Sequence, residues 1–215
     1  MVIKKGDFIE VEYTGRIRVS SQIFDSTDEA TAKKAGIKDD NAVYGPKVIC
    51  VSRNYILDAI DETFVGKEKG ASFTLELKPE QSFGHRDSKL IKTFPIDTLR
   101  KQKINPFPGL QLDLGGMVGV VRSVNSGRVM MDFNSPLAGR DVMYKIKIKD
   151  MVTDELKQLE GLVVVLLTLS SKDFTIEKKE EEYVLTVKKK VPDEIKKEFS
   201  QEVFEVLPKI KFKFA

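Results

Sequence analysis

The sequence has one cysteine, one histidine and no tryptophan among its 215 residues. A lone cysteine, Cys50, excludes an intramolecular disulfide, and its apolar neighbours in Val48–Val51 favour a buried thiol over a reactive one. A Ser/His/Asp or Cys/His triad would need His85, whose neighbours Arg86 and Asp87 indicate a solvated hinge instead. The same scarcity argues against a zinc site, and no motif calls for another metal or a cofactor.

The chain also lacks an excess of one charge and a long apolar run. Lys and Arg number 36 against 33 Asp and Glu, giving a net charge of +3. These charges are spread along the chain, which argues against a nucleic-acid partner. No segment approaches the roughly 18 apolar residues that would cross a bilayer, and the apolar start is too short for a signal sequence. We therefore expect a cytoplasmic protein with no membrane partner.

Alternating apolar and polar residues predict a half-buried antiparallel sheet. Ile9, Val11 and Tyr13 share one face of the first strand, and the same alternation recurs over residues 73–77 and 144–148. The fold class expected from this pattern is α+β, because helical spacing follows in other segments.

Residues 54–64 have the spacing of a helix, with Asn54 as its cap and Gly66 as its stop. This helix is expected to cover the sheet with four apolar side chains, those of Ile56, Leu57, Ile60 and Phe64.

Between residues 86 and 131, prolines and glycines separate short apolar runs, which predicts an inserted small β-rich unit. One helix is expected there, over residues 96–102. Gly115–Gly119 lacks the lysine of a phosphate loop and indicates a hairpin or the entry to a strand. The segment is rich in Phe, Leu and Met for its length, which favours exposed apolar surface, although most of these residues must form the unit's own core.

A further α+β unit is predicted over residues 155–215. Residues 154–160 indicate a connector, and residues 162–169 indicate an apolar strand that must be buried on both faces. The elements expected after them are two strands, a helix opened by proline and a last strand, at residues 174–178, 183–189, 192–207 and 209–214. Because roughly 60 residues bury little surface alone, we expect a homodimer through this unit, although its own helix could cover the strand.

Five segments, in this order, resemble the FKBP family of peptidyl-prolyl isomerases in its SlyD-like subfamily: Val11–Gly15, Phe24–Asp25, Ile56–Ile60 followed by Val65–Gly70, Ser82–Gly84, and Asp132–Arg140. The resemblance, to the long archaeal type with an extra C-terminal domain, implies an FKBP-like twisted sheet wrapped on a short helix. It implies three domains, an isomerase domain, an insert-in-flap chaperone domain and a C-terminal α+β domain, at residues 1–85 plus 132–152, 86–131 and 155–215.

The resemblance also implies the site. An X-Pro amide resists rotation because of its resonance, and an apolar pocket can ease rotation without a nucleophile. Carried over residue by residue, the catalytic residues are Asp25, Tyr13 and Leu57, the last through its backbone N–H. The residues implied to bind substrate are Phe24, Ile49, Ile56, Ile60, Phe83, Leu137 and Tyr144. The partners implied are unfolded polypeptides that contain X-Pro bonds.

This sequence departs from the family pattern at three positions. Ile60 and Ile49 replace the Trp and Phe that are common in relatives, and Phe83 lacks the hydroxyl of the usual Tyr. Turnover is therefore expected to be lower than in typical members, and a holdase with a decayed pocket stays open as an alternative. A structural dimer whose C-terminal domain binds a specific partner is a third reading.

At the level of single residues, two plainer readings stay open. Asp25 could cap a helix over residues 29–35. Tyr13, Ile56 and Ile60 could be ordinary core residues.

Overall fold

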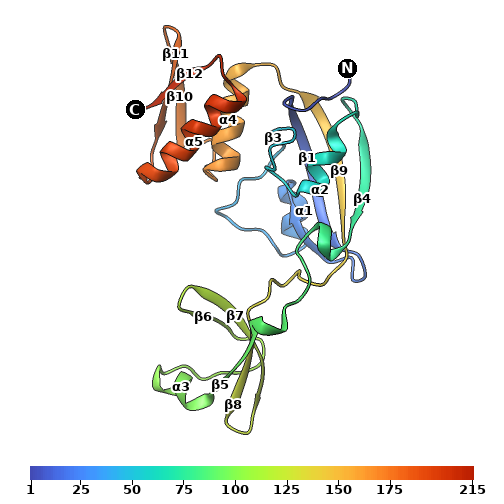
Figure 1. Ribbon diagram of the computed structural model, residues 1–215, viewed down its shortest axis with the longest axis vertical. Helices are drawn as coiled ribbons and strands as arrows, with labels where there is room; N and C mark the ends of the chain where they lie inside the picture. Colours follow the sequence, from blue (N-terminus) through green and yellow to red (C-terminus); the bar gives the residue numbers. More distant parts are fainter. The chain divides into compact units, whose positions relative to one another are not determined.

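The computed structural model describes residues 1–215, which form two compact units. The main unit comprises residues 1–77 and 141–215, and the insert unit comprises residues 78–140. The mixture of antiparallel sheets with a few helices fits an FKBP-like α+β fold (Figure 1).

The main unit contains a five-stranded antiparallel sheet in the order β2-β1-β9-β4, with β3 also paired to β1. Alternation along β9 leaves Ile146 and Ile148 fully buried while Lys145 and Lys147 face outward. This confirms the predicted one-sided sheet. Its strands are β1 (Phe8–Ile17), β2 (Ile23–Ser26), β3 (Lys47–Cys50), β4 (Ser72–Leu77) and β9 (Val142–Met151).

The helix predicted over residues 54–64 is shorter than expected. It consists of α2 (Asp58–Asp61) and a 3-10 turn (Glu62–Phe64). Asn54 does not cap it, because its backbone is left-handed (φ 57°) and its N–H donates to the Asp61 carboxylate at 2.9 Å. The predicted apolar face is nevertheless present, since Ile60 and Phe64 are completely buried.

The insert unit has one four-stranded antiparallel sheet, in the order β5-β8-β7-β6. A short helix packs on it around a small core of Leu99, Val121, Val129 and Met131. The glycines at 115 and 116 form the β6–β7 hairpin turn, as predicted. Its elements are two 3-10 turns (Pro79–Gln81, Ser88–Leu90), β5 (Ile91–Pro95), α3 (Ile96–Lys101), β6 (Gln111–Leu114), β7 (Met117–Asn125) and β8 (Arg128–Asp132).

Residues 162–166 of the apolar run lie in a helix, so both the predicted strand and the connector predicted before it are wrong. Helix α4 (Glu155–Leu166) begins after Asp154, whose carboxylate accepts a hydrogen bond from the Lys157 N–H at 2.9 Å. The β-branched run favours a strand by propensity, but packing overrides that preference. Leu159, Leu162 and Val163 show the spacing of a buried helical face.

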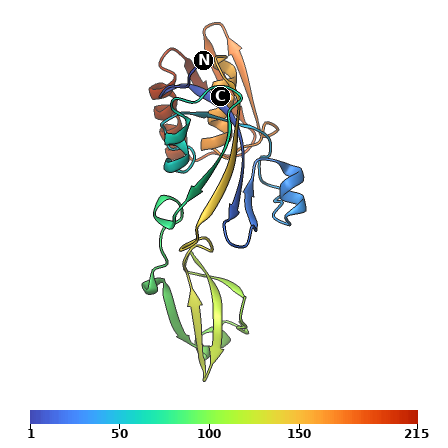
Figure 2. The same ribbon diagram turned by 90° about the vertical axis from the view of Figure 1, so that its right-hand side faces the viewer.

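The remaining C-terminal elements follow the prediction closely. A three-stranded sheet, in the order β10-β11-β12, lies with two helices (Figures 1 and 2). Pro192 immediately precedes the last helix, where its fixed φ suits a helix start. The elements are β10 (Phe174–Lys179), β11 (Glu182–Val187), α5 (Asp193–Val206) and β12 (Lys211–Phe214).

The C-terminal helices share a core with the main sheet. Phe8 and Cys50 of the sheet region are buried in one apolar cluster with Leu159 and Phe199. Helix α4 meets β3 at Gly161, where an added Cβ would lie 2.6 Å from the Val48 Cβ. The chain itself covers the apolar run, so a second copy of the chain is not needed to bury it.

Cys50 is buried as predicted, and burial raises the pKa of its thiol to about 11. A thiol in that state is not a nucleophile at neutral pH. No helix of the structure is both long enough and apolar enough to cross a membrane.

Candidate active site

Three aromatic rings meet on the main sheet. Gly15 of β1 pairs with Tyr144 of β9 on one side and with Asp25 of β2 on the other. The ring of Tyr144 makes edge contacts with Phe24 and Tyr13, with centroids 5.7 Å and 6.0 Å away. Edge-to-face pairs of this kind fix the positions of the rings, and the surface they form has few polar atoms. The structure thus brings together four of the predicted site residues.

Gly15 makes this cluster possible, and its role was missed at the sequence level. A Cβ at this position would lie 2.8 Å from Phe24 Cζ and 2.9 Å from Tyr144 Cε1. Only a residue without a side chain allows both rings to approach the strand. The signal was present, because Gly15 ends the Val11–Gly15 segment.

Asp25 follows Phe24 on β2, and its charge acts on both tyrosines of the cluster. Burial raises the pKa of its carboxyl, while the charge of Lys47 and the backbone N–H of Ser26 oppose that rise. Burial also raises the pKa of Tyr13 and of Tyr144, and the charge of Asp25 adds to both shifts. Both phenols therefore keep their protons at neutral pH and can act as hydrogen-bond donors.

The alternative in which Asp25 caps a helix is wrong. Helix α1 (Glu29–Lys34) is capped by Asp28, whose carboxylate accepts from the Thr31 N–H at 2.8 Å. Thr27 instead ties this region to β1, since its hydroxyl accepts from the Tyr13 N–H at 3.0 Å. Asp25 is left on β2 beside the aromatic cluster.

A cavity of about 220 Å³ adjoins Phe24 and Asp25. Its other walls include Tyr44 from the segment before β3, Lys47 at the start of β3, and Val164 from α4. Sequence reasoning missed these residues, because no local pattern predicts that the C-terminal helix reaches the edge of this site.

Four other predicted residues lie in β3 or around α2. Ile49 is in β3, Ile56 and Leu57 precede α2, and Ile60 is in α2. Ile49 and Ile60 are buried, with 3% and 0% exposure, and Ile56 and Leu57 are half-buried. Leu57 stands at the N-terminal cap of α2, where its carbonyl accepts from the Ile60 and Asp61 N–H groups. No hydrogen bond within the protein is donated by its own N–H.

Phe83 and Leu137 belong to the insert unit, where both side chains are half-buried. His85 lies in the same unit, with its side chain 68% exposed and 3.3 Å from Glu80. This confirms the solvated setting predicted for His85. The structure contains no group of three His, Cys, Asp or Glu residues placed to hold a metal.

Comparison with known proteins gives matches to both parts of the chain. A family model described as "FKBP26, IF domain" matches residues 92–137. The chain is 29% identical over 150 residues to a short-type peptidyl-prolyl cis-trans isomerase of Methanocaldococcus jannaschii, covering 70% of this chain and 94% of the relative.

Two bacterial relatives are also similar. The FKBP-type peptidyl-prolyl cis-trans isomerase SlyD of Aeromonas hydrophila is 28% identical over 49% of this chain, which spans about half (51%) of that relative. The FKBP-type 16 kDa peptidyl-prolyl cis-trans isomerase of Escherichia coli K12 is 26% identical over 44% of this chain and 66% of its own length.

Proposed function

We propose that this chain, which belongs to the FKBP-type peptidyl-prolyl cis-trans isomerases and is SlyD-like, rotates X-Pro bonds at the aromatic cluster of its main unit. We further propose that its insert unit captures unfolded polypeptide and supplies it to that site. The observation that supports the first proposal is the meeting of Tyr13, Phe24 and Tyr144 beside Asp25.

The chemistry needs no covalent step. Rotation about an X-Pro bond is opposed by amide resonance, which water strengthens by solvating the polar planar form. A cluster of aromatic rings removes that solvation from the prolyl amide. The less polar, twisted amide is then disfavoured less than the planar ground state, and the barrier falls.

Each predicted catalytic residue has a physical role in this scheme. The Leu57 N–H donates to a substrate carbonyl. Asp25 polarises the approaching carbonyl carbon or orients the hydroxyl of Tyr13, which remains protonated because burial raises its pKa. The smaller Ile49 and Ile60 leave the prolyl ring more loosely held than Phe and Trp would, so turnover is expected to be low.

The insert unit offers apolar side chains to solvent. Phe107 and Val118 are 56% and 58% exposed, and Met117 and Met130 are 40% and 41% exposed. Methionine adapts its shape to different partners, which suits the binding of varied unfolded chains. A chain held there meets the isomerase site at a raised effective concentration.

A second candidate function is a holdase whose prolyl pocket has lost catalysis. The departures at Ile49, Ile60 and Phe83 favour it, because each removes surface or a hydroxyl from the family pocket. In that case the insert unit carries the whole activity.

Proline-limited refolding of a test protein separates the two candidates. An isomerase accelerates the slow phase at catalytic amounts, far below the client concentration. A holdase suppresses aggregation only near stoichiometric amounts and leaves the slow phase unchanged. Absence of acceleration, with aggregation suppressed, would overturn the isomerase proposal.

A further inference from the structure

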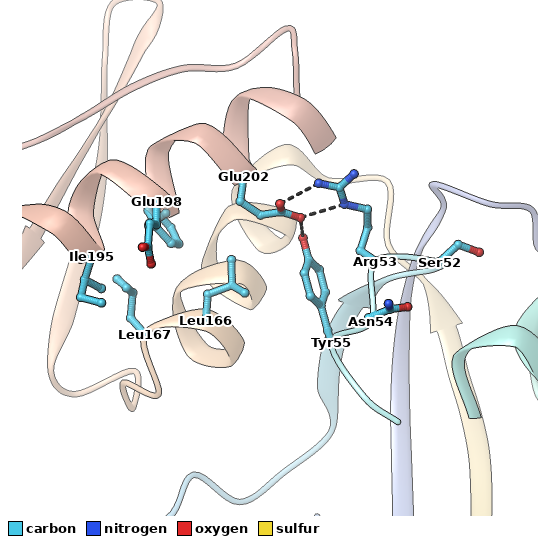
Figure 3. Close-up of a pocket in the computed structure, with 10 residues that line it drawn as sticks. Ser52, Arg53, Asn54, Tyr55, Leu166, Leu167, Ile195, Glu198 and Glu202 are labelled. Carbon is cyan, nitrogen blue, oxygen red and sulfur yellow. Dashed lines mark hydrogen bonds and ion pairs between the residues drawn. The ribbon is translucent and has the colours of Figure 1, made fainter. Parts of the chain in front are cut away.

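Helix α5 holds the loop that precedes α2. Arg53 donates from Nε to Glu202 Oε1 at 2.8 Å and from Nη2 to Glu202 Oε2 at 2.6 Å (Figure 3). The Tyr55 hydroxyl donates to the same carboxylate. Arg53 Nη2 also contacts Glu205 at 2.7 Å. One glutamate thus holds two residues of a single short loop.

The opposite side of this loop is fixed by a buried carboxylate. The N–H groups of Ser52 and Asn54 each donate to Asp61 at 2.9 Å, and Asp61 is only 1% exposed. Ser52 and Asn54 both have left-handed backbones, with φ of 67° and 57°. Such conformations are costly outside glycine and persist where the surroundings impose them. The loop is therefore held in one shape by Asp61 and Glu202 together.

The same loop carries the proposed substrate contacts. Tyr55 is followed directly by Ile56 and Leu57, whose N–H is the proposed donor to the substrate carbonyl. With planar peptide bonds, two residues leave only a few soft dihedrals between the Tyr55 anchor and that N–H. A shift of Tyr55 therefore moves the donor.

We propose that Glu202 is a positioning residue for the isomerase, holding Arg53 and Tyr55 so that the Leu57 N–H faces the substrate. The inference rests on the proposed function and gives the C-terminal region a part in it. Glu202 does not touch substrate, and its effect passes through the loop.

Charge and protonation keep this clamp closed at neutral pH. Hydrogen bonds from Arg53 and Tyr55 lower the pKa of Glu202, so its carboxylate stays ionised. Burial, and then the hydrogen bond to Glu202, raise the pKa of Tyr55, so its hydroxyl stays a donor. Charge-assisted bidentate bonds of this kind are the strong ones and fix geometry as well as energy.

The clamp borders open space, which makes its effect separable from folding. A cavity of about 580 Å³ lies between the loop and the two C-terminal helices, lined by Tyr55, Leu166, Ile195 and Glu202 among others (Figure 3). Water can fill the volume left by a shortened Glu202. Glu198, four residues earlier on α5, lines the same cavity without an ion pair and provides a matched control.

The test compares Glu202→Ala, Glu202→Gln and Glu198→Gln in the full chain, by kcat and KM for isomerisation of a proline tetrapeptide. Glu202→Ala is expected to lower kcat/KM about tenfold, because displacement of an oriented group by a fraction of an ångström has effects of this size. Glu202→Gln keeps one acceptor and is expected to lose about threefold. Glu198→Gln is expected to match the wild type.

Three further measurements keep the inference falsifiable if Glu202→Ala folds poorly. Tyr55→Phe removes only the hydroxyl bond and is expected to lose about threefold in kcat/KM. The Arg53→Ala/Glu202→Ala double variant is expected to lose no more than Glu202→Ala alone, since both residues serve one clamp. Backbone amide exchange is expected to quicken over residues 52–57 in all clamp variants.

Three outcomes contradict the inference. An active Glu202→Ala with unchanged kcat/KM and a lower melting temperature makes the clamp purely structural. If Glu198→Gln loses as much kcat/KM as Glu202→Gln, the effect comes from the negative charge of α5 and not from the clamp. A wild type with no isomerisation at all overturns the proposed function as well, and this result differs from the first two because every variant is then equally inactive.

Discussion

The main unit and the insert unit use apolar side chains in opposite ways. In the main unit, Phe24 and Tyr144 approach Gly15 closely, and Tyr13 contacts Tyr144. Tyr144 is buried, and Tyr13 and Phe24 are half-buried. In the insert unit, Phe107 and Val118 are more than half exposed. A unit of this size, with a core of four fully buried side chains, has too little interior to cover its apolar residues. Concave apolar surface removes water from one bond, whereas exposed apolar surface binds many chains weakly.

The largest expected effect comes from removing most of the insert unit. Deletion of residues 86–131 with a short linker should abolish aggregation suppression and lower the refolding rate of protein clients by about tenfold or more. Isomerisation of a tetrapeptide should stay within about twofold of the wild type, because so short a substrate gains nothing from capture. Light scattering and peptide kinetics measure the two effects. Equal loss of both activities would break the division between the units.

The second prediction concerns the Asp25 carboxyl group beside the rings. Asp25→Asn should lower kcat/KM for the tetrapeptide about tenfold, since electrostatic groups at reacting centres contribute at this scale. Aggregation suppression should not change. Asp28→Asn is the matched control, because Asp28 caps α1 and an asparagine also caps well. Loss of suppression in Asp25→Asn would contradict the separation of roles.

The third prediction tests the close approach at Gly15. Gly15→Ala places a methyl group 2.8 Å from Phe24 Cζ, so the rings must move. Overpacking of this kind costs about 1–3 kcal/mol in the free energy of unfolding. Peptide isomerisation should fall with it, and urea unfolding followed by tyrosine fluorescence measures the stability change. An unchanged free energy of unfolding would show that the rings can shift without destabilising the protein.

The fourth prediction probes single side chains of the insert unit. Phe107→Ser should weaken aggregation suppression a few-fold and leave the melting temperature unchanged, because Phe107 is exposed and contributes little to the core. Val19→Ser, at a main-unit position with 93% exposure, is the control. If both variants weaken suppression equally, general surface apolarity rather than the insert unit binds clients.

The smallest expected effect is on stability against pH. Burial raises the folded-state pKa of Asp25 above its ordinary value of 3.8, so ionising it disfavours the folded chain. Its favourable contribution is complete below pH 3.8 and is lost as pH rises through the raised pKa. Asp25→Asn should therefore be slightly more stable than the wild type at pH 7, with the difference vanishing toward pH 3. Chemical unfolding at several pH values measures it, and an advantage that grows toward acid would contradict the sign.

Much of the fold could be predicted from sequence because its signals are local. Alternation along β9 and the proline before α5 are read within ten residues. The strand predicted for the apolar run of α4 was wrong, because a continuous apolar run with β-branched residues occurs in buried strands and in buried helices alike. Only its packing on Val48 through Gly161 decides between them.

The site was predictable in part for the same reason. Tyr13, Phe24 and Asp25 lie in matching segments, and the fold brings them to Tyr144. Lys47 and Val164 carry no local signal, and neither does the bond between Arg53 and Glu202, which are 149 positions apart. Such pairs are fixed by tertiary packing alone.

The central claim is that the main unit itself rotates an X-Pro bond. NMR exchange spectroscopy of a proline tetrapeptide, with the chain at about one hundredth of the peptide concentration, tests it without a refolding client. We predict exchange cross-peaks between cis and trans forms for the wild type and for the chain without residues 86–131, and much weaker ones for Asp25→Asn. Peptide binding with no cis-trans exchange in the wild type would contradict the account.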